Sequence, residues 1–248
     1  MSKESTTRFG NSGERLHAFP SRLQLKHLNI AISALVLMVF SLLSPFKASA
    51  LPKCGHFPLP PQGCSSPILI DTDGKGFHLT SAEEGVPFDI TGDGHLTRMA
   101  WTAPGSTNAF LALPQDGTIN SGKDLFGNFT PQPQSSHPNG FLALAVYDQP
   151  ENGGNGDGVI DEKDGIFSSL RLWIDSNHDG VAQAEEIHSL PELGVFSISL
   201  HYRESRKEDQ YGNLFRYWSR INLIDPDEDD SRAGRVAYDV FFTTVADQ

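Results

Sequence analysis

The sequence predicts an α+β fold, in which a mainly antiparallel β body carries an inserted lobe made of loops and a helix. Short apolar runs separated by Gly- and Asp-rich turns are typical of antiparallel strands. Aromatic, alternating segments near the end of the chain indicate a further strand pair. Between these regions, residues 148–190 hold two Asp-, Asn- and Gly-rich loops around a short amphipathic stretch.

The β body is expected to begin with short strands at 67–71, 77–80, 87–90, 98–102 and 110–113. Residues 141–147 (FLALAVY) favour a helix, because Leu and Ala are strong helix formers, and a buried strand is the alternative. After the lobe we expect a short helix and turn at 187–194 and a strand at 195–200. An antiparallel pair at 215–224 and 235–245 follows, joined by an acidic loop.

The second loop of the lobe satisfies the EF-hand pattern D-x-[DN]-x-[DN]-G-x(5)-E. Alternating oxygens point inward from a tight turn, a glycine at position 6 permits the bend, and a carboxylate at position 12 closes the shell around a calcium ion. The candidate ligands are Asp175, Asn177, Asp179, the Val181 carbonyl, Gln183 and Glu186.

The first loop is a variant of the same pattern. Gly153 stands at position 1 and has no side chain to offer, so we expect Asp148 to supply that oxygen across an inserted QPENGG segment. The expected ligands are Asp148, Asn155, Asp157, the Val159 carbonyl, Asp161 and Asp164. A helix over 162–172 would separate the two loops, and a short ribbon of 159–160 with 181–182 would join them.

The alternative is that these clusters are ordinary turns, since Asp, Asn and Gly dominate turns in any case. Two tandem loops at this spacing favour calcium. Two weaker candidates precede them: Asp71 and Asp73, where Lys75 stands at an oxygen position, and Asp89, Thr91 and Asp93, where Ala100 stands at position 12. Each of these turns either holds a weak ion or binds none.

Residues 1–50 are interpreted as a secretory signal peptide. A basic segment precedes an apolar run over 28–43, and Ala48-Ser49-Ala50 resembles a cleavage site. The apolar run is short for a membrane span, although an uncleaved anchor is the alternative. We therefore expect a secreted or envelope protein with no membrane span in the mature chain.

The remaining chain is acidic, because residues 1–50 carry more Lys and Arg than Asp and Glu while the whole chain has a formal net charge of −12. Such a chain repels phosphate, which argues against nucleic-acid binding. Its length suits a Pro-rich segment at 51–66 and a single domain at 67–248. Cys54 and Cys64 are expected to form a local disulfide rather than half of a zinc site, because their spacing is wrong for the latter.

The order of motifs resembles the calcium-dependent self-processing module of large secreted RTX-type bacterial proteins. The similarity covers about residues 66–202, and the joint order is more specific than any one loop. The motifs are PILIDTDG (67–74), FDITGDG (88–94), FLAL (110–113), DGTIN and DLFG (116–127), NGFLALA (139–145), GDGVID (156–161), LRLWIDSNHDGV (170–181) and LGVFSISL (193–200).

The resemblance implies a module that calcium folds and that then breaks an Asp-Pro bond at its N-terminal edge. Pro67 matches that proline, but Ser66 stands where the aspartate is expected, so the carboxylate needed for self-cleavage is missing. We expect the cleavage to be lost. Similar stand-alone secreted proteins that carry calcium loops share the C-terminal aromatic segment.

Calcium binding in a structural role is therefore the expected function. A residual self-processing activity and a dockerin-like or adhesive module that binds an extracellular protein or polysaccharide are the alternatives. The chain has no G-x-S-x-G or H-E-x-x-H motif, so nothing indicates a catalytic residue.

Overall fold

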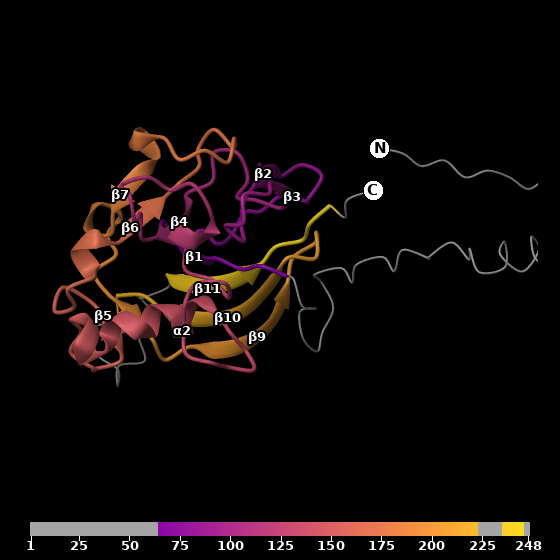
Figure 1. The fold of residues 1–248 in the computed structure, drawn as a ribbon. Coiled ribbons are helices and arrows are strands. Elements are labelled where there is room, and N and C mark those ends of the chain that lie inside the picture. The colour runs from indigo at the N-terminus through magenta and orange to yellow at the C-terminus, as the bar shows by residue number, and fades with distance from the viewer. Residues whose placement is uncertain (1–63, 223–234, 246–248) are drawn as a thin grey trace, which may run out of the picture. The chain divides into compact units, whose positions relative to one another are not determined.

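The computed structural model describes residues 64–222 and 235–245, and its centre is one antiparallel sheet of seven strands (Figure 1). The strand order across the sheet is β7-β6-β4-β1-β11-β10-β9. The strands are β1 (Ile68–Asp71), β4 (Asn108–Ala112), β6 (Arg171–Trp173), β7 (Ile187–Ser189), β9 (Arg203–Glu208), β10 (Leu214–Arg220) and β11 (Val236–Phe241).

Both faces of the central strands are buried, which explains why they are almost continuously apolar. Successive side chains of a strand point to opposite faces. Ile68 and Ile70 accordingly pack in one core and Leu69 in the other. We call these the α2-side core, which includes Phe141, and the tryptophan-side core, which includes Trp101.

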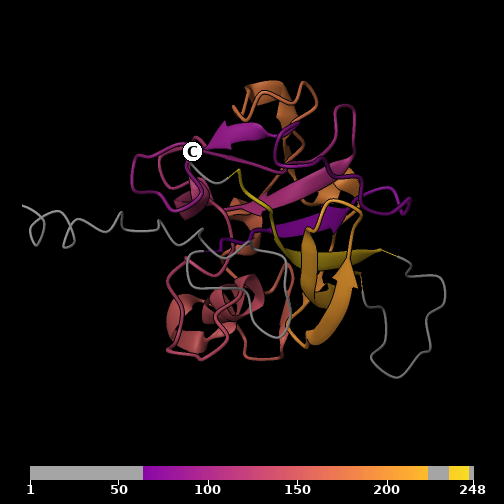
Figure 2. The ribbon, with the colours of Figure 1, turned by 90° about the vertical axis from the view of Figure 1, so that its right-hand side faces the viewer.

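Different elements cover the two faces. The α2-side core is covered by helix α2 (Gly140–Leu144), which continues as a 3-10 turn, η2 (Ala145–Asp148), and by the small ribbon of β5 (Val159–Ile160) with β8 (Ile198–Ser199). The hairpin of β2 (Val86–Phe88) and β3 (Thr97–Met99) packs into the tryptophan-side core. The two sets lie on opposite sides of the sheet in both views (Figures 1 and 2).

Helix α2 confirms the helical prediction for residues 141–147. Its N-cap is Asn139, whose side-chain oxygen accepts the Leu142 amide at 3.0 Å. The Gly140 amide donates to the buried Asp239 carboxylate on β11 at 2.8 Å. The start of the helix is thereby fixed to the middle of the sheet.

The fold-class prediction is wrong about the inserted lobe. The body is mainly antiparallel β, but no EF-hand-like helical lobe is present in the described residues. The helix expected over 162–172 is replaced by a three-residue 3-10 turn, η4 (Phe167–Ser169), and by β6. Leu172 pairs with Leu111 and Trp173 with Phe110, so burial in the sheet overrides the helical spacing of Ile166, Phe167 and Leu170.

Two further predictions about the lobe are wrong. The loops are not joined to each other by a ribbon, because β5 pairs with β8 instead, and Val181 is exposed. The short helix expected after Glu186 is strand β7 followed by a 3-10 turn, η6 (Pro191–Leu193). The side chain of Ile187 packs against the tryptophan-side core, which favours the strand.

The remaining strand predictions are largely confirmed, with shorter elements. β1, β4, β10 and β11 lie where expected, and β2 and β3 are trimmed to three residues each. Residues 77–80 contribute only a single bridge, between Leu79 and Thr102. The charged edge strand β9 was not predicted, because its sequence RESRKE lacks apolar alternation.

Several predictions fall outside the described residues. These are the signal peptide at 1–50, the Cys54 half of the disulfide and the acidic loop at 225–231. Cys64 is buried and is not a free cysteine. No helix of the described part of the chain is long and apolar enough to cross a membrane.

Candidate metal-binding loops

Asp175 is the first residue of the 175–186 loop and is fully buried. Only Ile174 separates it from the end of strand β6. One carboxylate oxygen, Oδ1, accepts the Asp179 amide at 3.2 Å, and Oδ2 accepts the Gly180 amide at 2.8 Å. Oδ2 also accepts the indole N–H of Trp101 at 2.7 Å. Gly180 has a φ of 73°, the left-handed conformation that lets the chain turn back around the carboxylate.

Glu186 closes the same loop from its other end and is 4% exposed. Its Oε1 accepts the Ser176 amide at 2.9 Å, and its Oε2 accepts the Trp173 indole N–H at 3.3 Å. A 3-10 turn, η5 (Ala184–Glu186), aims this carboxylate back at the start of the loop. The first and twelfth positions are therefore held together.

The middle of the 175–186 loop carries further side-chain oxygens. Asn177 and Gln183 both donate their amide groups to Asp179 Oδ2, at 3.0 and 2.8 Å. The Gln183 carbonyl oxygen, Oε1, is buried and faces the Glu186 amide in a capping-box arrangement, but it makes no close hydrogen bond in the described part of the chain. An oxygen that is desolvated without a donor is costly, which favours a cation as its partner.

The 148–164 loop has the same arrangement despite its insertion. The two carboxylate oxygens of Asp148 accept the Gly156 and Gly158 amides, each at 3.1 Å. Asp148 thus meets the glycine at position 6, as Asp175 meets Gly180. The inserted residues form a 3-10 turn, η3 (Pro150–Asn152), and Gly154 then passes so close to Asp148 that a Cβ there would lie 2.2 Å from its backbone.

Asp164 closes the 148–164 loop and is 2% exposed. It accepts the Asp161 amide at 2.9 Å and the Asn155 amide at 3.2 Å. Asp157 and Asp161 point to the same lysine, because the Lys163 ammonium lies 3.6 Å from Asp157 and 3.3 Å from Asp161. Hydrogen bonding to Asp161 raises the pKa of Lys163, so this ammonium is firmly charged.

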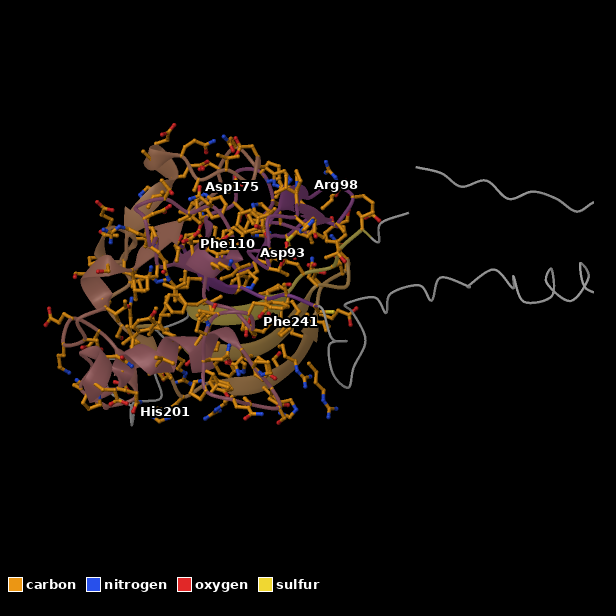
Figure 3. All side chains as sticks on the ribbon, viewed as in Figure 1. Asp93, Arg98, Phe110, Asp175, His201 and Phe241 are labelled. Atoms are coloured by element: carbon orange, nitrogen blue, oxygen red, sulfur yellow. The ribbon has the colours of Figure 1, made fainter. Side chains whose placement is uncertain are left out.

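The two loops do not form an EF-hand pair. The 148–164 loop lies against the α2-side core through Ile160, whereas the 175–186 loop lies against the tryptophan-side core through Ala182. Figure 3 marks Asp175 above the sheet and His201, beside the first loop, below it. His201 belongs to that neighbourhood because a Cβ on Gly158 would meet its ring at 2.8 Å.

Four carboxylates at the ends of these loops are buried without a cationic partner. None of the salt bridges of the described residues involves Asp148, Asp164, Asp175 or Glu186. Burying an unpaired charge is expensive, and backbone amides compensate only part of that cost. These four carboxylates therefore have no salt-bridge partner within the described residues.

The donor chemistry fits a hard divalent cation such as calcium, which takes carboxylate, amide and carbonyl oxygens. Carboxylates alone do not make the sites. In the described part of the chain, no group of three or more His, Cys, Asp or Glu side chains is arranged to hold a metal ion. Asn155, Asn177, Gln183 and backbone carbonyls would have to complete the two shells.

The two weaker candidates are arranged differently. Asp71 accepts the Gly74 and Gly76 amides, but Asp73 is engaged by the Lys75 ammonium at 2.8 Å. Asp89 likewise accepts the Asp93 and Gly94 amides. The Lys123 ammonium contacts the Gly92 carbonyl, and Asp93 contacts His95 at 3.2 Å and is hydrogen-bonded to the Thr91 side chain.

Sequence reasoning missed the groups that hold the 175–186 loop in place from a distance. Trp101 donates to Asp175 across 74 positions, and no local pattern signals that contact. The His178 ring meets the Thr102 carbonyl at 2.7 Å and the Glu84 carbonyl at 2.8 Å. His178 has a φ of 62°, uncommon for a non-glycine residue, which matches its place in a tight loop.

The expectation that self-cleavage is lost concerns Ser66, which lies just before β1. Ser66 is 4% exposed, and its amide donates to Asn128 Oδ1 at 2.9 Å. The nearby Asp239 is fully buried, and its burial raises its pKa to about 7, against hydrogen bonds with Ser66 and the Gly140 amide. Residue 66 itself offers only a hydroxyl, so no carboxylate is present at that position.

Comparison with known proteins places the chain in a family. The iron-regulated protein FrpA of Neisseria meningitidis serogroup C is 35% identical over 150 residues, which are 59% of this chain but 13% of FrpA. The chain therefore spans only a small part of that relative. The model of the SPM domain matches residues 68–242, a range that contains the whole sheet and both loops. The chain belongs to the SPM domain family.

Proposed function

We propose that this protein is a secreted calcium-binding protein whose ions are structural. One ion would be held by the 175–186 loop and one by the 148–164 loop, without the flanking helices of an EF-hand. The observation that carries the proposal is the set of four buried carboxylates, Asp148, Asp164, Asp175 and Glu186, that have no cationic partner in the described residues.

The role is structural because both loops are part of the core rather than appendages. Asp175 and Glu186 accept the indole N–H groups of Trp101 and Trp173, two fully buried residues of the tryptophan-side core. A cation between these carboxylates would relieve their repulsion and fix the ends of β6 and β7. Its loss should therefore loosen the sheet edge rather than a surface loop alone.

The expected size of the effect follows from mass action. Extracellular calcium modules bind at about 10⁻⁴ to 10⁻³ M. At 10 mM calcium each site then stabilises the fold by about 1.4–2.7 kcal/mol. For a domain of this size that corresponds to a rise in melting temperature of about 3–10 °C per site.

The test compares thermal unfolding in calcium and in chelator for the wild type, Glu186→Gln and Asp164→Asn. Each substitution keeps the shape of the side chain and removes one charge. We expect each to lose part of the calcium-dependent rise, and magnesium to act more weakly because it demands near-octahedral geometry. Equal melting temperatures in calcium and chelator for the wild type would refute the proposal.

The alternatives have less support. Self-processing would need a carboxylate where Ser66 stands. A dockerin-like module would need a helix after each loop, and in the described residues each loop is followed by a 3-10 turn or a strand instead. Binding of an extracellular protein or polysaccharide has no residue that favours it.

A further inference from the structure

Lysine ammonium groups sit on three of the four Asp-Gly loops described above. Lys75 contacts Asp73 at 2.8 Å, Lys123 contacts the Gly92 carbonyl, and Lys163 bridges Asp157 and Asp161. The 175–186 loop is the exception, because no lysine or arginine of the described residues forms a salt bridge with its carboxylates.

We propose that Lys163 is a built-in counter-ion of the 148–164 loop that calcium must displace, so that the 175–186 loop takes up calcium first. This inference rests on the proposed function of the two loops. It assigns them an order of filling and names the residue that sets it.

The competition follows from where Lys163 points. Asp157 and Asp161 are the expected ligands at positions 5 and 9 of their loop, and both oxygens that face Lys163 would have to turn to a bound cation. A cation in the loop would also be repelled by an ammonium within about 4 Å of the same carboxylates. The lysine and the ion therefore compete for the same carboxylates.

The lysine is able to leave. Its side chain is 62% exposed, so the ammonium can move into water when an ion arrives. Exposed ion pairs are weak, so removing the two contacts should tighten calcium binding only by about twofold to thirtyfold. The predicted effect is a shift in affinity and not a gain of a new site.

The first experiment measures calcium binding by titration calorimetry to the full chain carrying Glu186→Gln, which leaves the 148–164 loop as the main site. Adding Lys163→Met should tighten that site by about twofold to thirtyfold. It should also lower the melting temperature in chelator, because the carboxylates lose their counter-ion. Arg206→Met is the matched control, since Arg206 is exposed on edge strand β9 and its loss changes net charge equally.

A second variant introduces a lysine at the equivalent position of the 175–186 loop. Lys163 stands one residue before the closing carboxylate of its loop, and Glu185 holds that place in the 175–186 loop. Glu185→Lys in the Asp164→Asn background should weaken calcium binding at the 175–186 loop beyond what Glu185→Gln does. The glutamine variant controls for the lost negative charge.

The outcomes separate this inference from the function on which it rests. If the wild type takes up no calcium, both fail. If the wild type binds calcium but Lys163→Met binds no more tightly than Arg206→Met, or Glu185→Lys binds as Glu185→Gln does, the lysine does not compete and this inference alone is overturned. Tightening at one loop and weakening at the other would establish it.

Discussion

The carboxyl group of Asp239 is an example of a single residue whose charge state affects the whole sheet. It lies fully buried on β11 and accepts the amide that begins helix α2. Desolvation, the largest influence, raises its pKa from 3.8 to about 7. The folded protein therefore binds a proton there between about pH 4 and pH 7 that the unfolded chain does not bind.

Replacing Asp239 by Asn should stabilise the protein at pH 8 and change little at pH 4. Because the folded pKa is raised, stability from this group is present below the unfolded pKa and is lost as pH rises through about 7. The gain at pH 8 is at most about 4 kcal/mol, from 1.36 kcal/mol per pKa unit. Urea unfolding of both proteins at pH 4, 6 and 8 measures it, and a difference independent of pH would contradict the assignment.

At the scale of elements, the 148–164 loop shows how an insertion is absorbed. The η3 turn carries the chain outward from Asp148, and Gly154 brings it back against the Asp148 backbone. Because the chain returns so close to Asp148, the Asp148 carboxylate can accept the Gly158 amide. The loop geometry thus depends on one residue without a side chain.

Gly154→Ala should therefore cost more stability than Gly156→Ala. A Cβ at Gly154 would lie 2.2 Å from the Asp148 backbone, which cannot yield, whereas nothing lies within 4 Å of a Cβ at Gly156. Gly156 has a φ of 75°, so its substitution should cost only about 1–2 kcal/mol of backbone strain. Chemical unfolding in calcium and in chelator distinguishes them, because Gly154→Ala should also weaken the calcium response. Equal costs for the two would argue against this account of the insertion.

The sequence indicated elements that are defined by local pattern. β1, β4, helix α2 and the pair β10–β11 follow from apolar runs and alternation along the chain. The helix prediction for residues 162–172 was wrong because the spacing of their apolar residues is equally compatible with a turn and a strand. Only pairing with β4 decides between these structures. β9 was not predicted because its charged residues show no apolar alternation. Such charges suit the exposed edge of a sheet, where the Lys207 ammonium lies 4.4 Å from the centre of the Phe215 ring.

The candidate ligands, including Asp148 across the insertion, were chosen from spacing alone, and their binding of calcium stays a prediction. The groups that surround them could not be predicted from the sequence. The contact of Trp101 with Asp175 and the attachment of His178 to two carbonyls depend on how distant segments meet. The position of Lys163 in the loop is evident from the sequence, but the sequence does not show which oxygens its flexible ammonium contacts.

At the scale of the whole molecule, the sheet separates two cores and joins the two loops. β1 and β4 are buried on both faces, β11 is buried on both faces only over its second half, and β9 and β7 are the outer strands. Each loop is anchored to a different core, so a cation bound at either proposed site would act on the common sheet.

Amide hydrogen exchange should reflect that arrangement. We expect the slowest exchange at β1, β4 and β11, because each of them has a paired strand on either side, and faster exchange at the edge strand β9. Chelation should accelerate exchange first around β6 and β7, which lead into and out of the 175–186 loop. Protection at β9 as strong as at β1 would show that the sheet is not organised in this way.

The pairing of β1 with β11 has a consequence for how the protein folds during its synthesis. Ile68, in the first described strand, faces Asp239, in the last, so the centre of the sheet consists of segments from opposite ends of the described chain. Contacts between such remote segments form slowly, because a long loop must close before they gain anything. A growing or translocating chain has an open β1 edge until β11 arrives, and the sheet cannot be completed before residue 241 has been delivered.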